Sequence, residues 1–184
     1  AAQVPPPKAG VRFAGLMDRL AAEHPEMRFR FTSPHPKDFP DDLLEVIRDR
    51  PNACASLHIP AQSGSTRVLQ SMRRGYSRDT YLALIGRVRE LLPHASLSSD
   101  FISGFCGETE ADHMETLSLL EAVRFDKAFM FAYSMREKTH AHRRLADDVP
   151  EPTKLRRLRE VIDTFSAGAR AANQAEVHSH HLVL

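Results

Sequence analysis

Hydrophobic and polar positions along the chain follow two periods, one typical of strands and one typical of helices. Four short apolar runs predict strands at 28–31, 56–59, 97–102 and 127–132. In the segments between and around these runs, apolar residues recur every three or four positions, which predicts amphipathic helices. The predicted helices lie at 13–22, 41–50, around 68–72, and at 77–92, 109–123 and 154–172.

A strand begins roughly every thirty to forty residues, which is the length of a strand–helix repeat with parallel strands. The run KAFMFA at 127–132 is almost continuously apolar, as in a strand covered on both faces. We therefore expect an α/β fold, with a parallel sheet and outer helices. Because a closed eight-stranded barrel takes about 250 residues, the sheet is either open or an incomplete parallel (β/α) barrel.

Composition narrows the class of protein. The chain has 184 residues, a net charge of +1 and 42% hydrophobic residues, as in one soluble domain rather than a general polyanion binder. No run approaches the roughly 18 apolar residues of a membrane span, so we expect no membrane partner. Residues 1–10 read as a flexible, Pro-rich lead. Cys54 and Cys106 form no CxxC or CxxxC pair, so we expect no metal ligands from cysteine.

The stretch SSDFISGFCGET at 98–109 carries the most chemical information. It predicts a strand, a glycine turn and a capped helix, and loops after parallel strands converge on one crevice. Asp100 and Glu108 bring carboxylates to this junction, and Gly104 would let the backbone approach a ligand. The alternative is a tight turn with solvated acidic side chains.

The loop after the second predicted strand, PAQSGS, has hydrogen-bonding groups suited to sugar hydroxyls or a carboxylate. Gln62, Ser63 and Ser65 provide these groups, and Gly64 permits close approach. The alternative is a polar loop with a helix cap.

Cationic groups follow other predicted elements. Arg74, at a helix C-terminus, either satisfies the helix dipole or pairs with a ligand carboxylate or phosphate. His35 follows the first strand and is either an acid or base or a structural residue. The basic segment 134–144 is either a contact for a phosphate backbone or a solvated loop.

Four motifs make the sequence recognisable: RFTSPHP, HIPAQSGSTRVLQSMRRGY, SLSSDFISGFCGET and FAYSMREKT, in this order. Together they resemble the radical-SAM core of MiaB-like tRNA methylthiotransferases. SPHPKDFPDDLLEVI and QSGSTRVLQSMRRGYSRDTY are most similar to the animal, largely mitochondrial branch named for association with a cyclin-dependent-kinase regulatory subunit. The resemblance covers almost the whole chain.

The resemblance implies an enzyme that adds a 2-methylthio group to N6-isopentenyladenosine next to a tRNA anticodon, using S-adenosyl-L-methionine (SAM). The full-length family has two [4Fe–4S] clusters, and a CxxxCxxC loop holds the one that generates the radical. The sequence lacks this loop, so we expect no cluster ligands and no activity from the chain alone. By this resemblance, residues 11–172 are the last four strands of a six-stranded barrel. Residues 173–184 are a tail at the start of a missing TRAM domain.

The resemblance also implies a set of binding residues at the strand ends. The expected SAM contacts are Gln62, Ser63, Gly64, Ser65, Arg74, Asp100, Ile102, Gly104, Glu108, Tyr133 and Ser134. The expected substrate contacts are His35 and Arg136, and we expect no catalytic side chain or metal ligand in this chain.

The branch implies tRNA as the partner and a mitochondrial location, with the cytoplasm as the alternative. Two other functions stay open. One is a non-catalytic truncated isoform that binds a protein, for example a kinase regulatory subunit. The other is an unrelated barrel enzyme in which Asp100 and Glu108 are acid and base.

Overall fold

A computed structural model describes residues 12–32, 36 and 39–180 of the chain. Its centre is a three-stranded sheet in the order β1–β2–β3, in which all neighbouring strands are parallel. The strands are β1 (Ser56–His58), β2 (Ser96–Ser103) and β3 (Lys127–Ala132). The helices are α1 (Phe13–Glu23), α2 (Asp41–Asp49), α3 (Thr66–Ser71), α4 (Arg78–Leu91), α5 (Glu110–Val123), α6 (His140–Arg144) and α7 (Glu151–Ala175). The parallel sheet with outer helices confirms the predicted α/β class.

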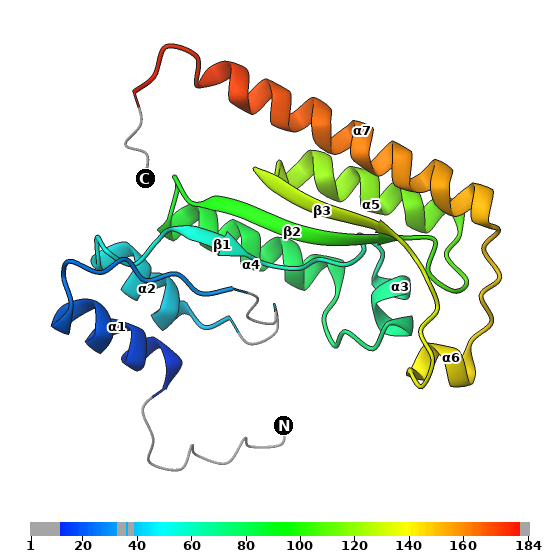
Figure 1. The fold of residues 1–184 in the computed structure, drawn as a ribbon, viewed down its shortest axis with the longest axis horizontal. Helices are drawn as coiled ribbons and strands as arrows, with labels where there is room; N and C mark the ends of the chain where they lie inside the picture. Colours follow the sequence, from blue (N-terminus) through cyan, green and yellow to red (C-terminus); the bar gives the residue numbers. More distant parts are fainter. Residues whose placement is uncertain (1–11, 33–35, 37–38, 181–184) are drawn as a thin grey trace.

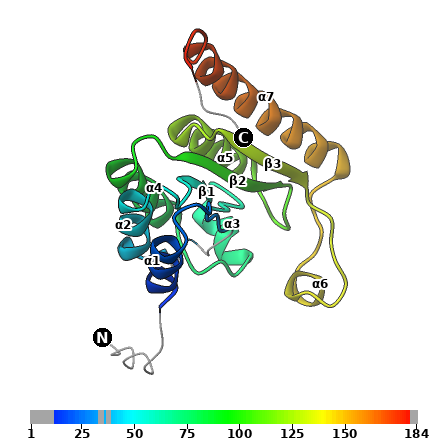
Figure 2. The ribbon, with the colours of Figure 1, turned by 60° about the vertical axis from the view of Figure 1, so that its left-hand side comes forward.

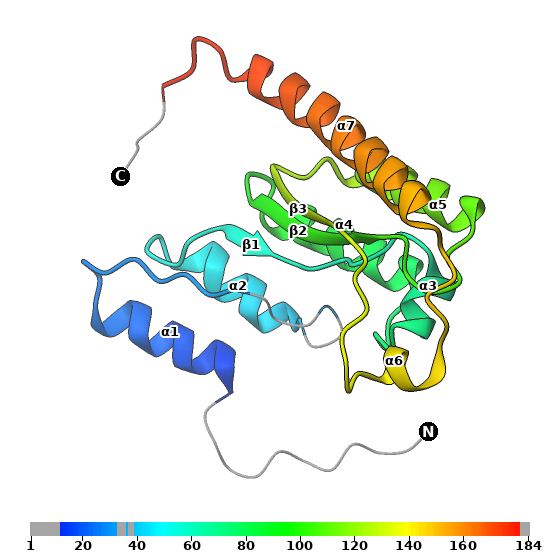
Figure 3. The same cartoon turned by 45° about the vertical axis from the view of Figure 1, so that its right-hand side comes forward.

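The helices are distributed unevenly around the sheet. Helices α4 and α5 lie along one face, and the long α7 runs beside α5 and β3 (Figure 1). Helices α1 and α2 pack together near the amino-terminal side of the sheet, whereas α3 and α6 lie beyond its other end (Figures 2 and 3). The ends of the strands that lead toward α3 and α6 are the carboxyl ends, where sequence reasoning places the ligand.

Strand β2 separates a buried face from an open face. Leu97 and Phe101 are fully buried in the main core, which also includes Val88 of α4 and Val161 of α7. Asp100, between them, is only partly buried. Because the full burial of one such apolar side chain stabilises the fold by about 1.5–3 kcal/mol, this alternation determines which face of β2 the helices cover.

The predicted first strand at 28–31 is wrong for the described residues. Phe29 forms a single parallel bridge with Ala53: Phe29 N donates to Asn52 O, and Cys54 N donates to Phe29 O, both at 2.8 Å. The next residue is held by its side chain instead, because Arg30 Nη2 donates to Ser56 Oγ at 2.9 Å. The segment therefore lies beside β1, as a fourth strand would, without a continuous ladder.

The predicted helices are confirmed with small changes at their ends. Helix α7 begins at Glu151 rather than Lys154, and it continues to Ala175 rather than 172. Helix α6 was expected as part of a basic loop; it is capped by Thr139, whose hydroxyl accepts a hydrogen bond from the His142 backbone at 3.2 Å.

Some predictions lie outside the described residues: the flexible lead at 1–10, the substrate contact His35 and the last four residues of the predicted tail. Within the described part of the chain, no helix is long and apolar enough to cross a membrane.

Candidate functional site

The carboxyl ends of the three strands meet through backbone hydrogen bonds. Gln62 N donates to Asp100 O at 2.8 Å, and Ile102 N donates to Gln62 O at 2.9 Å. Tyr133 N donates to Ser103 O at 2.8 Å on the other side of β2. Gln62 also has a φ of 66°, a conformation that costs a residue other than glycine about 1–3 kcal/mol. The strand ends therefore lie together at one edge of the sheet, as predicted.

A cavity of about 530 Å³ opens at these strand ends. Its volume lies within the range of about 300–1,000 Å³ that is usual for small-molecule sites. Five of the predicted binding residues line it: Arg74, Ile102, Tyr133, Ser134 and Arg136. The structure thus brings together residues that are far apart in the sequence.

Three aromatic side chains contribute to the wall of the cavity: Phe105, Phe131 and Tyr133. The rings of Phe105 and Tyr133 meet nearly edge-to-face, with their centroids 4.8 Å apart. Lys154 Nζ lies 5.5 Å from the Tyr133 ring centroid, within the range of a cation–π contact. Burial and the neighbouring Cys106 thiol raise the pKa of Tyr133 to about 12. The Tyr133 hydroxyl is protonated at neutral pH, as an ordinary tyrosine is, and a protonated hydroxyl can donate a hydrogen bond.

Two arginines bring positive charge to the cavity. Arg74 comes from the turn after α3 and Arg136 from the loop after β3. Neither side chain has an ion pair or hydrogen bond within the described ranges. An unpaired guanidinium beside an aromatic wall is suited to an anionic group on a planar ligand.

The loop between β1 and α3 faces α5 rather than this cavity. Ser63 and Ser65 are almost fully buried, and Ser65 Oγ donates to Asp112 Oδ1 at 2.6 Å. Gly64 N donates to Thr116 Oγ1 at 3.0 Å. Their side-chain contacts are therefore within the chain, and their predicted contact with SAM stays a prediction.

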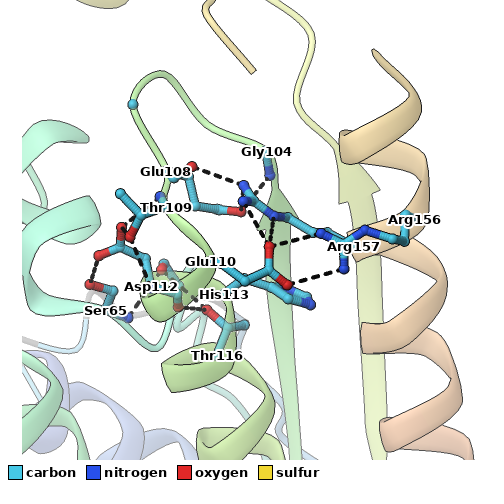
Figure 4. A network of polar contacts seen from close by, with 12 residues as sticks. Ser65, Gly104, Glu108, Thr109, Glu110, Asp112, His113, Thr116, Arg156 and Arg157 are labelled. Carbon is cyan, nitrogen blue, oxygen red and sulfur yellow. Dashed lines mark hydrogen bonds and ion pairs between the residues drawn. The ribbon is translucent and has the colours of Figure 1, made fainter. Parts of the chain in front are cut away.

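The turn after β2 is tied to α7 in the same way. Glu108 Oε1 accepts hydrogen bonds from Gly104 N at 3.0 Å and from Arg157 Nη1 at 3.1 Å (Figure 4). Burial raises the pKa of Glu108. Gly104 has a φ of +79°, and a Cβ there would lie 2.3 Å from Lys154 Cγ. Both residues brace the turn against α7, and their predicted contact with SAM also stays a prediction.

Asp112 fixes the start of α5. Its carboxylate accepts hydrogen bonds from Ser65, Thr109 and Arg67. Burial of Asp112 opposes ionisation, but these hydrogen bonds, led by the one from Arg67, outweigh it and lower its pKa well below the ordinary value. A charged Asp112 therefore holds the β1–α3 loop against the helix.

One group among the described residues has the spacing of metal ligands: Glu110, His113 and Glu160. Arg156 Nη1 donates to Glu160 Oε1 at 2.8 Å. Arg156 Nη2 donates to Glu110 Oε2, also at 2.8 Å (Figure 4). His113 Nε2 lies 2.6 Å from Glu160 Oε2. Because internal partners already engage each carboxylate, the group is an ion-pair network that joins α5 to α7.

Asp100 lies apart from Glu108, on the open face of the sheet. Its Oδ2 is 3.3 Å from His58 Nε2, and His58 Nδ1 is 3.0 Å from Ser98 Oγ. Glu108 is instead enclosed against Arg157. This arrangement gives no support to an enzyme in which the two carboxylates act together as acid and base.

Sequence reasoning missed several cavity residues. Met72 lies two residues before Arg74, and Phe105 directly follows Gly104. Phe131 is the register partner of Ile102. Correct pairing of the predicted strands would have found Phe131, since paired residues share a face of the sheet. His140 belongs to α6, whose position depends on the whole fold.

Comparison with known proteins identifies relatives. A CDK5RAP1-like protein of Oryza sativa subsp. japonica is 59% identical to this chain, over 95% of the chain and 29% of the relative. The mitochondrial tRNA methylthiotransferase CDK5RAP1 of Mus musculus is 59% identical over 97% of the chain and 30% of its own length. The tRNA-2-methylthio-N(6)-dimethylallyladenosine synthase of Chloroherpeton thalassium is 53% identical, over 84% of this chain and 34% of its own length. The chain thus spans about a third or less of the curated relatives it matches.

The fold agrees with a solved structure. Coproporphyrinogen III oxidase (HemN) from Escherichia coli, described as a radical SAM enzyme, matches with a TM-score of 0.65 at 23% identity, over 84% of this chain and 37% of that chain. This similarity confirms the architecture alone. The Radical SAM superfamily model matches residues 7–120, which is more than half of the chain. The relatives and the superfamily match confirm the resemblance predicted from the motifs, and the chain belongs to the radical SAM superfamily.

Proposed function

We propose that this chain forms the SAM-binding part of a tRNA methylthiotransferase. The proposed enzyme adds a 2-methylthio group to N6-isopentenyladenosine next to the anticodon. The names of the relatives support the reaction. One observation carries the proposal for the ligand: a cavity at the strand ends combines an aromatic wall with the unpaired Arg74.

The cavity residues fit the chemical groups of SAM. The Arg74 guanidinium can pair with a carboxylate in fork geometry. Ile102 and Phe105 offer apolar surface to a purine, whereas Tyr133 and Ser134 offer hydroxyls to a ribose or an amine. SAM, when bound, would supply the radical chemistry of the superfamily. The residues of this chain would bind it, orient it and limit the access of water.

The cysteines do not fit a [4Fe–4S] cluster. Such a cluster takes several thiolates, and the sequence has two cysteines. Cys54 precedes β1, whereas Cys106 follows β2, so they lie toward opposite ends of a parallel sheet. We propose that the ligands of both family clusters come from outside this chain and that the chain alone is inactive. The division into 1–10, 11–172 and 173–184 stays part of this proposal.

We also propose tRNA as the substrate and the mitochondrion as the location. The support is that relatives from Mus musculus and Homo sapiens are named mitochondrial tRNA methylthiotransferases. Arg136, at the cavity, is the proposed substrate contact. No feature of the described residues favours the binding of a kinase regulatory subunit, and that alternative is not proposed.

Calorimetric titration of the 184-residue chain with SAM tests the ligand. We expect Arg74→Gln to weaken binding by about 10- to 150-fold, because a hydrogen bond to a charged group contributes about 1.5–3 kcal/mol. Arg159→Gln, an exposed change on α7, is the matched control and should bind as the unaltered chain does. Equal SAM affinity of the Arg74 variant and the control would contradict the proposed site.

A product assay tests the expected inactivity. The chain is incubated with SAM, a reductant, iron, sulfide and tRNA that carries N6-isopentenyladenosine. We expect no methylthiolated nucleoside by mass spectrometry, and its formation would contradict the assignment of the cluster ligands to other parts of the enzyme.

A further inference from the structure

Two segments that contribute to the cavity lining, the turn after α3 and residues 136–144, carry positive side chains without acidic partners in the described part of the chain. These side chains are Arg73, Arg74, Arg136, Lys138, Arg143 and Arg144. Arginines elsewhere commonly have partners: Arg87 bonds Asp41 and Glu90, and Arg156 bonds Glu110 and Glu160. The cluster is therefore not explained by contacts that hold this fold together.

The neighbouring acidic residues do not neutralise the cluster. Asp147 Oδ1 pairs with the buried Lys154 Nζ at 2.7 Å. Asp148 Oδ1 accepts a hydrogen bond from Gly107 N at 2.6 Å. Glu137 is exposed and contacts none of these cations among the residues that the structure describes. Glu137 and Asp148 keep their negative charges, but two carboxylates against six cations leave a net positive charge at this edge.

The cations come from two segments that face each other across the cavity. Arg74 after α3 and His140 of α6 both line it. Partial burial of His140 and the charges of Arg73 and Arg144 together lower its pKa. The cations that follow α3 and those near α6 therefore lie in one region, beyond the carboxyl ends of the strands, where α3 and α6 are found (Figure 3).

Two of the cations have an uncommon backbone conformation. Arg73 and Lys138 have φ values of 59° and 65°, in the left-handed region that favours glycine. At Arg73 this conformation closes α3, since Arg74 N donates a hydrogen bond to Leu69 O at 2.9 Å. Long cationic side chains occupy both positions, although neither forms a contact in the described fold that would explain the choice.

We propose that Arg73, Lys138, Arg143 and Arg144, here called the basic rim, bind phosphates of an RNA strand at the cavity mouth. The exposed Phe131 and the Tyr133 ring line the cavity to which both segments contribute, and aromatic faces stack unpaired bases. Cationic side chains can bind phosphates, and the nearby aromatic rings can stack on bases. This combination fits single-stranded RNA better than an acidic peptide, which has no bases to stack. The inference rests on the proposed function and names the part of this chain that holds the RNA backbone.

The test measures binding of the 184-residue chain to a labelled RNA hairpin with an adenosine-containing, single-stranded loop. Fluorescence anisotropy is recorded over a range of KCl concentrations for the unaltered chain and for Arg143→Gln/Arg144→Gln. Each lost phosphate contact lowers the salt slope by about 0.7–0.9. We therefore expect the double variant to bind roughly 25- to 60-fold more weakly near 0.1 M salt.

Two further variants separate RNA contact from folding. Arg159→Gln/Arg170→Gln removes the same charge from exposed positions on α7 and should change RNA affinity little. Lys138→Gly removes a rim cation while relieving its backbone strain, so it should weaken binding without loss of thermal stability.

SAM affinity distinguishes this inference from the proposed function. Neither Arg143 nor Arg144 lines the cavity, so their variant should bind SAM as the unaltered chain does. The inference is overturned if the rim and control variants lose RNA affinity equally. Binding of the unaltered chain to phosphatidylserine vesicles but not to the hairpin would also overturn it. If the unaltered chain binds the hairpin through the basic rim but does not bind SAM, the result counts against the proposed function and leaves the basic rim supported.

Discussion

The β1–α3 loop provides the sharpest structural test, through Gly64→Ala. A Cβ at Gly64 would lie 2.3 Å from Glu115 O and 2.5 Å from Thr116 Cα. Both are backbone atoms of α5, which cannot rotate away as a side chain can. The loop must therefore move off the helix if any side chain is added at this position.

The cost can be worked out from the contacts that the movement breaks. Overpacking of a core costs about 1–3 kcal/mol. Separation also weakens the hydrogen bond from Gly64 N to Thr116, worth about 1 kcal/mol, and the one from Ser65 Oγ to the charged Asp112, worth about 1.5–3 kcal/mol. We expect a loss of about 4–7 kcal/mol, a large part of the 5–15 kcal/mol that usually stabilises a domain.

Urea unfolding followed by circular dichroism measures this loss. Gly86→Ala in α4 and Gly168→Ala in α7 are matched controls, because a Cβ at either would meet nothing within 4 Å. These controls should gain about 0.5–1 kcal/mol, since alanine is favoured over glycine inside a helix. If Gly64→Ala unfolds at the same urea concentration as the controls, the close packing of this loop on α5 is refuted.

Further predictions concern the contacts around α5 and α7. Arg157→Ala should lower the free energy of unfolding by about 3–5 kcal/mol in the same urea assay, because it leaves the buried Glu108 carboxylate unpaired. Stability should also fall in acid, measured as the unfolding midpoint from pH 6 to pH 2. Hydrogen bonding to Arg156 lowers the pKa of Glu110 to about 2, and the pKa of Asp112 is lowered too. Because the folded pKa values lie below the unfolded ones, this stabilisation is present above the ordinary range near 4 and is lost as the pH falls.

Two outcomes would contradict these predictions. An Arg157→Ala variant as stable as the unaltered chain would mean that the ion pair does not hold the turn. Asp112→Asn removes the contribution of Asp112 to the loss of stability in acid. Glu108 contributes a change of stability with pH of the opposite sign, because its pKa is raised. An unchanged acid slope in this variant would show that Asp112 does not cause the loss.

The local pattern of the sequence predicted the elements and their order. Buried residues alternate with less buried ones along β2, and apolar residues recur at helical spacing in α4. Both patterns could be predicted because each involves residues that are close in the sequence. The prediction of a strand at 28–31 was wrong because strand formation depends on which segment lies beside it in the fold. Phe29 bridges Ala53, and Arg30 reaches Ser56, contacts that no local pattern displays.

The candidate site was predicted in part for the same reason. Parallel topology correctly placed Ile102 and Tyr133 at one edge, because all strands end there. The partners of Ser65 and Glu108 could not be predicted, since Asp112 and Arg157 lie some fifty residues away on other helices. The sequence does not distinguish a polar side chain that binds a ligand from one that is buried and bonded to another residue. Only the fold shows which residue is its hydrogen-bond partner.

The central claim is that the cavity at the strand ends binds SAM, and titration of the isotopically labelled chain by NMR tests it most directly. We predict that SAM shifts the amide signals of Ile102, Tyr133 and Ser134, while that of Gly168 on α7 stays unchanged. Saturating SAM that leaves the three cavity signals in place, or that shifts only signals far from the strand ends, would contradict the account.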